Sequence, residues 1–252
     1  MTVPDTTMLR ESTPAPKRAS VWEDFVDIFA SPSEVFARRQ NGGFALPLLV
    51  LTLAMTALFF GTRSLLTPIF DAESSRQIAV AMKANPQMTQ EQAQGMRGMT
   101  ERMGGIFGGI AVLVIIPLTV LLIGVNTWIS GKPFGSVQTI RSAFVVATYS
   151  YFPKLIESVV SGIQGLLLDE GQMTSLHSIK LGITRFMDPD AAPVLTAFLG
   201  RLDLFTIWVT ILIGIGLRIT GKLTAAQAAG AAVLVWLLGS LPALLSGLRA
   251  AG

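Results

Sequence analysis

Five long apolar runs constrain this chain more than any other feature. They cover about residues 44–62, 104–130, 143–168, 194–217 and 225–247. A helix needs about 20 mainly apolar residues to cross the hydrocarbon core of a bilayer, and each run is close to that length. Charged residues make up 14% of the chain, whereas ordinary soluble domains carry about 25%, and the mean hydropathy is +0.58. The sequence therefore predicts an all-α, polytopic membrane helix bundle with about five transmembrane helices, and it argues against a soluble enzyme.

The residues before the first run divide into two parts. Residues 1–19 are rich in Pro, Thr and Ser and show no apolar periodicity, which predicts a disordered tail. Residues 20–43 begin with Ser20 and Glu23 in a capping-box pattern and are expected to form short amphipathic helices on the membrane surface. The alternative is that these helices pack on the protein's own loops. The candidate membrane-surface contacts are Trp22, Phe25, Phe29 and Phe36.

A long polar stretch, residues 63–103, separates the first two apolar runs. Asn85-Pro86 marks a break in it, and Thr89 with Gln92 matches a second capping box. We expect this stretch to form an extramembrane helical loop, so that the membrane domain spans residues 44–247.

Charged residues interrupt the third and fourth runs. Lys154 and Glu157 lie in the third run, and Arg201 and Asp203 lie in the fourth. A central charge costs roughly 2.5–3.5 kcal/mol on insertion, whereas each Leu, Ile, Val or Phe returns only roughly 0.3–0.6 kcal/mol. Depth matching predicts contacts of Lys154 with Asp203 and of Glu157 with Arg201. Such charges either form buried pairs or line a polar pathway; Asn126 in the second run is a further candidate for hydrogen bonding between helices.

Small residues four positions apart suggest close helix contacts. We expect them to pack inside the bundle; the alternative is a seam between two copies of the chain. The pairs are Gly104/Gly108, Gly105/Gly109 and Ser158/Gly162.

The composition argues against several kinds of chemistry. The chain has no cysteine and one histidine, His177, so no metal site built from these residues is predicted. No set of nucleophile, base and orienting group is visible, so we predict no enzyme activity and no cofactor. The 19 basic and 16 acidic residues are spread along the chain, which argues against a nucleic-acid partner.

Basic residues give the predicted orientation. The two shortest loops between the runs carry basic residues and no acidic ones, whereas the basic residues of the opposite side are mixed with acids in a longer loop. The positive-inside rule then places the N-terminus in the cytosol and the C-terminus on the far side. The basic residues on the cytosolic side are Arg38, Arg39, Lys132, Arg141, Arg218 and Lys222.

Four short motifs resemble the bacterial branch of the Yip (Ypt-interacting protein) family of multispanning membrane proteins. Ser31-Pro32-x-Glu34-Val35-Phe36 looks like the family's element before span one, and Tyr151-x-Pro153 fits a proline expected in span three. Asp203-x-Phe205-x-x-Trp208-x-x-x-Leu212-x-Gly214-x-Gly216 is similar to the span-four pattern. Leu223-Thr224-x-x-Gln227-Ala228 resembles the link into span five.

The resemblance implies a five-span bundle with a cytosolic N-terminal region, in the inner (plasma) membrane of a bacterium. Eukaryotic members of the family work in vesicle trafficking with Rab-type GTPases, but we do not extend that partner to this chain. We expect a non-catalytic membrane adaptor or organiser whose partners are the bilayer and either another protein or a second copy. The alternative is a transporter or channel for ions or small solutes that uses the charges of runs three and four.

Overall fold

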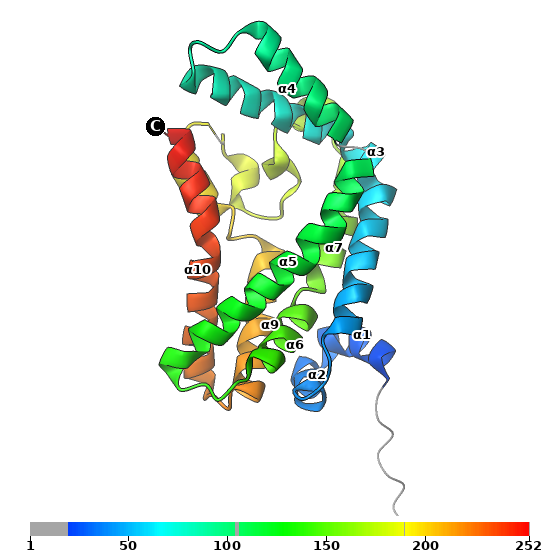
Figure 1. The fold of residues 1–252 in the computed structure, drawn as a ribbon, viewed down its shortest axis with the longest axis vertical. Coiled ribbons are helices and arrows are strands. Elements are labelled where there is room, and N and C mark those ends of the chain that lie inside the picture. Colours follow the sequence, from blue (N-terminus) through cyan, green and yellow to red (C-terminus); the bar gives the residue numbers. More distant parts are fainter. Residues whose placement is uncertain (1–19, 104–105, 189, 252) are drawn as a thin grey trace, which may run out of the picture.

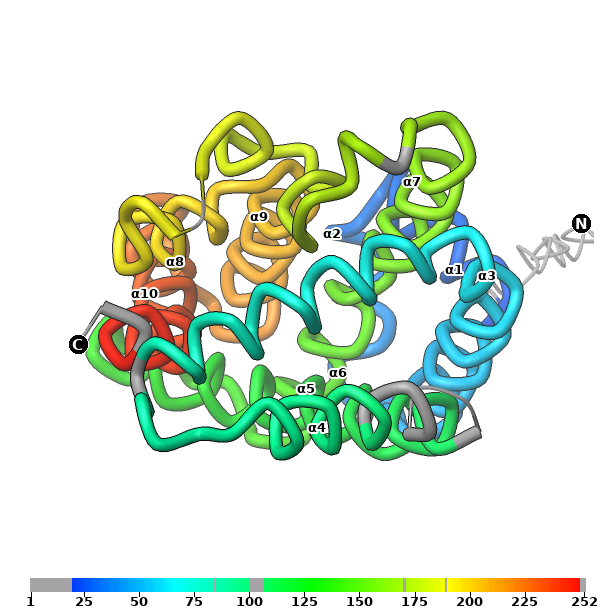
Figure 2. The backbone as a smooth tube through the Cα atoms, turned by 90° about the horizontal axis from the view of Figure 1, so that it is seen from above, coloured from blue at the N-terminus to red at the C-terminus, as the bar shows by residue number. Residues whose placement is uncertain are grey.

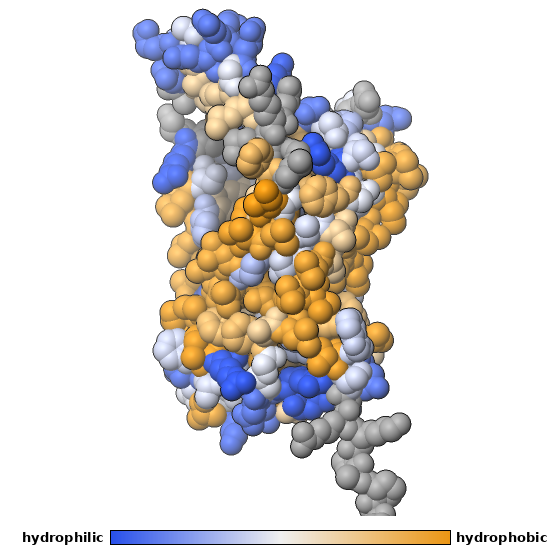
Figure 3. Space-filling model, turned by 45° about the vertical axis from the view of Figure 1, so that its right-hand side comes forward, coloured by the Kyte–Doolittle hydropathy of each residue, from blue (hydrophilic) through white to orange (hydrophobic). Residues whose placement is uncertain are grey.

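The computed structural model describes residues 20–103, 106–188 and 190–251, so the predicted tail 1–19 lies outside the described residues. The described chain is a bundle of helices (Figure 1), which confirms the predicted all-α fold. On the face shown in Figure 3, apolar residues cover the middle of the molecule and polar residues gather at its two ends. By length and composition, α3 (Ala45–Ala84), α5 (Ile106–Gly131) and α10 (Ala225–Ala251) could each cross a membrane. Helix α9 (Leu204–Thr220) is apolar but shorter.

Helix α3 has 40 residues and bends over one end of the bundle. Pro68 lies inside it and has no N–H to donate to the preceding turn, so the helix can kink there. Figures 1 and 2 show its second half lying across the bundle beside α4 (Gln90–Met103). The predicted helical loop 63–103 therefore does not begin as a separate helix, because α3 continues from the first apolar run to Ala84 without a break. We call this end of the molecule the α4 end.

The third run is two helices rather than one. Helix α6 (Ile140–Ser150) ends before Tyr151 and Phe152, and α7 (Pro153–Leu167) begins at a proline. A proline fits the first turn of a helix, but it cannot donate a hydrogen bond to an earlier turn. The prediction of one helix over 143–168 is therefore wrong.

The fourth run is also divided. Helix α8 (Pro193–Leu199) packs against α10 near the α4 end, and α9 begins only at Leu204. Asp203 is the N-cap of α9, since its carboxylate accepts hydrogen bonds from the backbone N–H groups of Phe205 and Thr206 at 3.0 and 3.1 Å. The run 194–217 is thus not one continuous helix, and Arg201 and Asp203 precede α9 instead of lying within a helix.

Between α7 and α8 the chain crosses the α4 end in short turns. These are η2 (Glu170–Gln172), η3 (Leu176–Ile179) and η4 (Ile183–Phe186). We call residues 168–188 the cap loop. Its Met173 is buried with Leu66 and Ile69 of α3, so the loop packs on the region where α3 bends.

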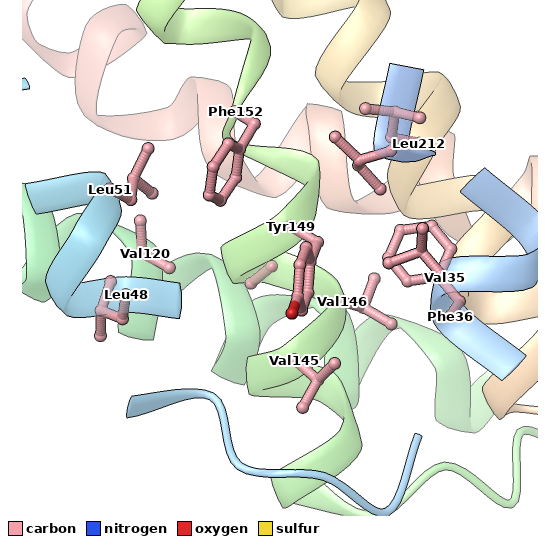
Figure 4. Packing of buried hydrophobic residues seen from close by; sticks show 12 residues of the cluster. Val35, Phe36, Leu48, Leu51, Val120, Val145, Val146, Tyr149, Phe152 and Leu212 are labelled. Atoms are coloured by element: carbon pink, nitrogen blue, oxygen red, sulfur yellow. The ribbon is translucent and has the colours of Figure 1, made fainter. Parts of the chain in front are cut away.

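The N-terminal helices form a hairpin at the opposite end, which we call the α2 end together with the turn η1 (Lys132–Phe134). Helix α1 (Val21–Ala30) begins with the predicted capping box of Ser20 and Glu23, and α2 (Pro32–Arg39) packs against α9 and α6. Figure 4 shows Val35 and Phe36 beside Val146 and Leu212 in the main core cluster. The hairpin is therefore part of the folded bundle.

Two glycines allow α3 to approach its neighbours closely. A β-carbon at Gly162 would lie 2.5 Å from Cγ2 of Thr62, and one at Gly109 would lie 2.1 Å from the ring of Phe60. Gly109 and Gly162, two members of the predicted small-residue pairs, thus allow close helix packing inside the bundle. Gly104 and Gly105 lie outside the described residues.

Candidate functional site

A cavity of about 360 Å³ lies between α3, α5 and α7. The two long helices contribute mainly apolar side chains to its wall, and α7 contributes two charged side chains and two hydroxyls. Tyr151, at the break between α6 and α7, and Ile179 of the cap loop also line it. The apolar side includes Met55, Phe59, Val112 and Ile116, and the polar side of α7 is formed by Lys154, Glu157, Ser158 and Ser161.

Lys154 and Glu157 form an ion pair on one face of α7. The Nζ atom of Lys154 lies 2.5 Å from Oε2 of Glu157, and the two side chains are 19% and 24% exposed. The opposite charges offset part of the cost of removing each group from water. The predicted contact of Glu157 with Arg201 is not formed; Glu157 has a local partner instead.

Asp203 connects to this pair through a hydroxyl group. Its side chain is buried and accepts a hydrogen bond from the hydroxyl of Thr206, in addition to the two backbone bonds of the N-cap. Lys154 Nζ in turn donates to Oγ1 of Thr206 at 3.3 Å. Lys154 and Asp203 are therefore close, as predicted, but no direct ion pair joins them among the described side chains. The carboxylate of Asp203 mainly caps the N-terminus of α9.

Helix α10 holds Arg201 and Asn126 in place. The carbonyl of Arg201 accepts a hydrogen bond from the indole N–H of Trp236 at 3.1 Å, and its Nε donates to Ser240 at 3.4 Å. Asn126 donates to the carbonyl of Val235 at 2.9 Å, which is the interhelical bond expected of a polar residue in a membrane helix.

Lys180 is a further charged residue near this site that was not predicted, because a lysine in a loop carries no sequence signal of burial. The cap loop is fixed on both sides of this partly buried residue: Gln164 of α7 donates to the carbonyl of Ile179 at 2.7 Å, and the N–H of Leu204 donates to the carbonyl of Leu181 at 3.1 Å. Burial is the main cause that lowers the pKa of Lys180, and Lys154 and Arg201 lower it further; the nearby carboxylates Asp203 and Glu157 oppose this change.

A second, larger cavity of about 760 Å³ lies toward the α4 end and shares Phe59 with the first. Its wall is more polar and includes Arg63, Asp71 and Arg97. Beside it, Arg76 forms ion pairs of 2.6 Å with Glu73 and 2.8 Å with Asp190. These contacts tie the second half of α3 to the segment that follows the cap loop.

A different cluster fastens the hairpin at the α2 end. Asp24 is completely buried, and its two carboxylate oxygens lie 2.7 Å from Nε of Arg38 and 2.5 Å from Nε of Arg39. The hydroxyl of Tyr149 donates to the same carboxylate at 3.1 Å. Burial would lower the pKa of Arg38, but its hydrogen bonds to Asp27 and Asp24 outweigh that effect and raise it. One carboxylate thus joins α1, α2 and α6.

The four predicted membrane-surface side chains have different environments. Trp22 is 69% exposed, and Phe29 is partly exposed with its ring 5.7 Å from that of Trp208. Phe25 stacks on Phe152 at 4.9 Å. Phe36 is fully buried, so its prediction as a membrane contact is wrong: α2 turns this face toward α6 and α9.

Comparison with known proteins gives one family and one relative. The family model of the Yip1 domain matches residues 26–246. A curated relative, the membrane protein YknW of Bacillus subtilis (strain 168), is 30% identical over 121 residues, which is 48% of this chain and 47% of the relative. The match thus spans about half the length of that relative. No solved structure matches the chain.

Proposed function

The chain belongs to the Yip1 domain family, and from this premise we propose that it is a non-catalytic adaptor or organiser of a bacterial inner membrane. The observation that carries the proposal is the α1–α2 hairpin. Asp24 anchors it from within, while Trp22 and Val26 on its outer face are 69% and 70% exposed. A rigid element that presents apolar side chains at the edge of the apolar band is suited to hold lipid or a protein partner.

The proposed topology has five crossings, with the α2 end in the cytosol. The crossings are the first half of α3, then α5, α6 with α7, α9 and α10. Dense basic residues in the loops of the α2 end support this orientation, and so does family membership. A role in trafficking rests on family membership alone.

The cavity beside Lys154 and Glu157 favours transport as a second candidate function, because ionisable groups at membrane depth often mark a pathway. The packing of the α2 side weighs against it. Tyr149, Phe152, Val120 and Leu51 belong to one buried core cluster there, so that side is closed by close-packed side chains. For this reason we place the adaptor first.

Flux measurements on purified protein in liposomes test the choice. We expect no uptake of ions or small solutes above that of empty liposomes. Uptake by the wild-type chain that Glu157→Gln abolishes would contradict the adaptor and support the transporter. Glu91→Gln is a matched control, because Glu91 lies exposed on α4.

The adaptor itself is tested on the hairpin in cells. Photo-crosslinking groups placed at Trp22 and Val26 should capture one defined protein or lipid partner, and the same group at the buried Phe36 should capture none. Equal capture at all three positions, or none at the exposed two, would refute the role of the hairpin.

A further inference from the structure

We propose that two basic segments at the α2 end form a surface for the head groups of anionic phospholipids. The segments are residues 131–141, from the end of α5 to the start of α6, and residues 218–224, from the end of α9 to the start of α10. We call them together the basic platform. The inference goes beyond the adaptor role, which rests on the hairpin. From the proposed topology it takes only that the α2 end lies at a membrane surface.

Hydrogen bonds join the two segments of the basic platform, although they are far apart in the chain. The N–H of Val137 donates to the carbonyl of Gly221 at 3.2 Å. The buried side chain of Gln138 donates through Nε2 to the hydroxyl of Thr220 at 2.6 Å. Figure 1 shows both segments at the lower end of the bundle. The fold therefore brings their charged side chains onto one surface.

The platform presents positive charge without acidic residues of its own. Residues 104–156 and 204–252 contain neither Asp nor Glu, so the flanking helices add no carboxylate on this side either. The four basic side chains of the platform are exposed, and among the described residues no carboxylate oxygen lies within 4 Å of their nitrogens. These side chains are Lys132, Arg141, Arg218 and Lys222.

The neighbouring hairpin does not cancel this charge. Residues 20–43 carry four acidic and two basic residues, and both Arg38 and Arg39 pair with Asp24. With the four cations of the platform, the α2 end has six positive and four negative charges, a formal sum of +2. The surplus lies on the platform, where it attracts anions from solution or from a membrane surface.

Lys222 is in a position that is unfavourable for a lysine within the fold itself. Its φ of 55° is in the left-handed region, which glycine adopts freely and L-residues with a side chain avoid. It is the one non-glycine residue with positive φ in the part of the chain that the structure describes. It also precedes α10, and a cation near a helix N-terminus opposes the helix dipole. Arg141, the second residue of α6, has the same unfavourable charge. An interaction outside the chain accounts for both cations.

Apolar neighbours indicate that the partner is a lipid surface. The Nζ atom of Lys132 lies 4.9 Å from the centre of the Trp128 ring near the end of α5, and tryptophan is enriched where membrane helices reach the head groups. Ile129 is 50% exposed one turn before this lysine, and Val137 is 61% exposed between the cations. Basic side chains beside exposed apolar ones fit the boundary between head groups and hydrocarbon.

The test measures which lipids lie next to the full chain in reconstituted bilayers. Protein in phosphatidylcholine membranes receives a trace of spin-labelled phosphatidylglycerol or of spin-labelled phosphatidylcholine, and electron paramagnetic resonance gives the fraction of each label in contact with protein. We expect the anionic label to associate several-fold more strongly than the zwitterionic one. The preference should fall as NaCl is added, because salt screens exposed charges.

Two substitutions locate the surface. The double variant Arg141→Gln with Lys222→Gly should lose at least about half of the preference, because each basic residue near an anionic surface strengthens association roughly fivefold. Lys222→Gly is also informative alone, since glycine suits this backbone: its unfolding temperature should be at least that of the wild type while its lipid preference falls. It therefore decides the question even if Arg141→Gln, which loses the hydrogen bond to the carbonyl of Gly42, fails to fold.

The matched control removes the same number of charges at the α4 end. Lys83 and Arg249 are exposed near the ends of α3 and α10, and Lys83→Gln with Arg249→Gln should keep the wild-type preference. Equal association of both labels with the wild-type chain, an unchanged preference in Lys222→Gly, or an equal loss in the control pair would overturn the proposal. Crosslinking at Trp22 and Val26 reads out the hairpin separately, so failure of one proposal is distinguishable from failure of the other.

Discussion

The bundle contains two ionic clusters made of similar residues in different surroundings. At the α2 end, Asp24 has two arginines and a tyrosine around it and is completely buried. In the middle, Lys154 and Glu157 are 19% and 24% exposed beside a cavity. The first cluster fills its space and holds helices together. The second borders a cavity, so similar chemistry joins helices in one place and faces open space in the other.

The largest effect should come from breaking the cluster around Asp24, which we call the closed cluster, as distinct from the Lys154–Glu157 pair beside the cavity, which we call the open cluster. Asp24→Asn leaves two arginines without a buried counter-charge, and we expect a loss of about 3–5 kcal/mol of stability. Denaturant unfolding in micelles measures it. Asp27→Asn is the matched control, because Asp27 is 35% exposed and also pairs with Arg38; exposed pairs contribute at most about 1 kcal/mol. Similar losses in both variants would remove the distinction between closed and open clusters.

Tyr149→Phe should have a smaller effect of the same kind. It deletes one hydrogen bond to the Asp24 carboxylate and keeps the ring in the core, so the expected loss is about 1.5–3 kcal/mol. In the double variant with Asp24→Asn the two losses should not add, because the tyrosine then has no charged acceptor. Additive losses would mean that the hydroxyl stabilises the fold by another contact.

Glu157→Gln in the open cluster should lower the free energy of unfolding by about 1 kcal/mol or less. The side chain faces a cavity and is partly exposed, so water can replace part of the lost interaction. The same unfolding measurement applies. A loss as large as that of Asp24→Asn would show that the central pair is a structural element like the closed cluster.

Local patterns in the sequence were sufficient to predict the helical bundle and some residues of the candidate site. Apolar runs predicted a helical bundle and located its long apolar helices α3, α5 and α10, and charges inside two of the runs pointed to Lys154 and Glu157 as site residues, although the predicted partners were Asp203 and Arg201. The breaks at Pro153 and Asp203 were also visible as a proline and an N-cap residue, but the surrounding apolar residues suggested continuous spans. Contacts such as Asp24 with Tyr149, or Lys180 with the interior, join distant segments, so no local pattern indicates them.

The short length of α9 has a consequence for the surrounding lipid. Its 17 residues extend about 25 Å, whereas the hydrocarbon core is about 30 Å thick. Next to it in the cap loop, Ile183 and Phe186 are 55% and 86% exposed. If α9 crosses the bilayer as proposed, we expect the lipid on this side to thin by a few ångström or to be met by those two side chains, and to keep its full thickness beside α5 and α10. Such uneven thickness would give the molecule a front and a back within the plane of the membrane, and neighbours of different hydrophobic length would sort between them.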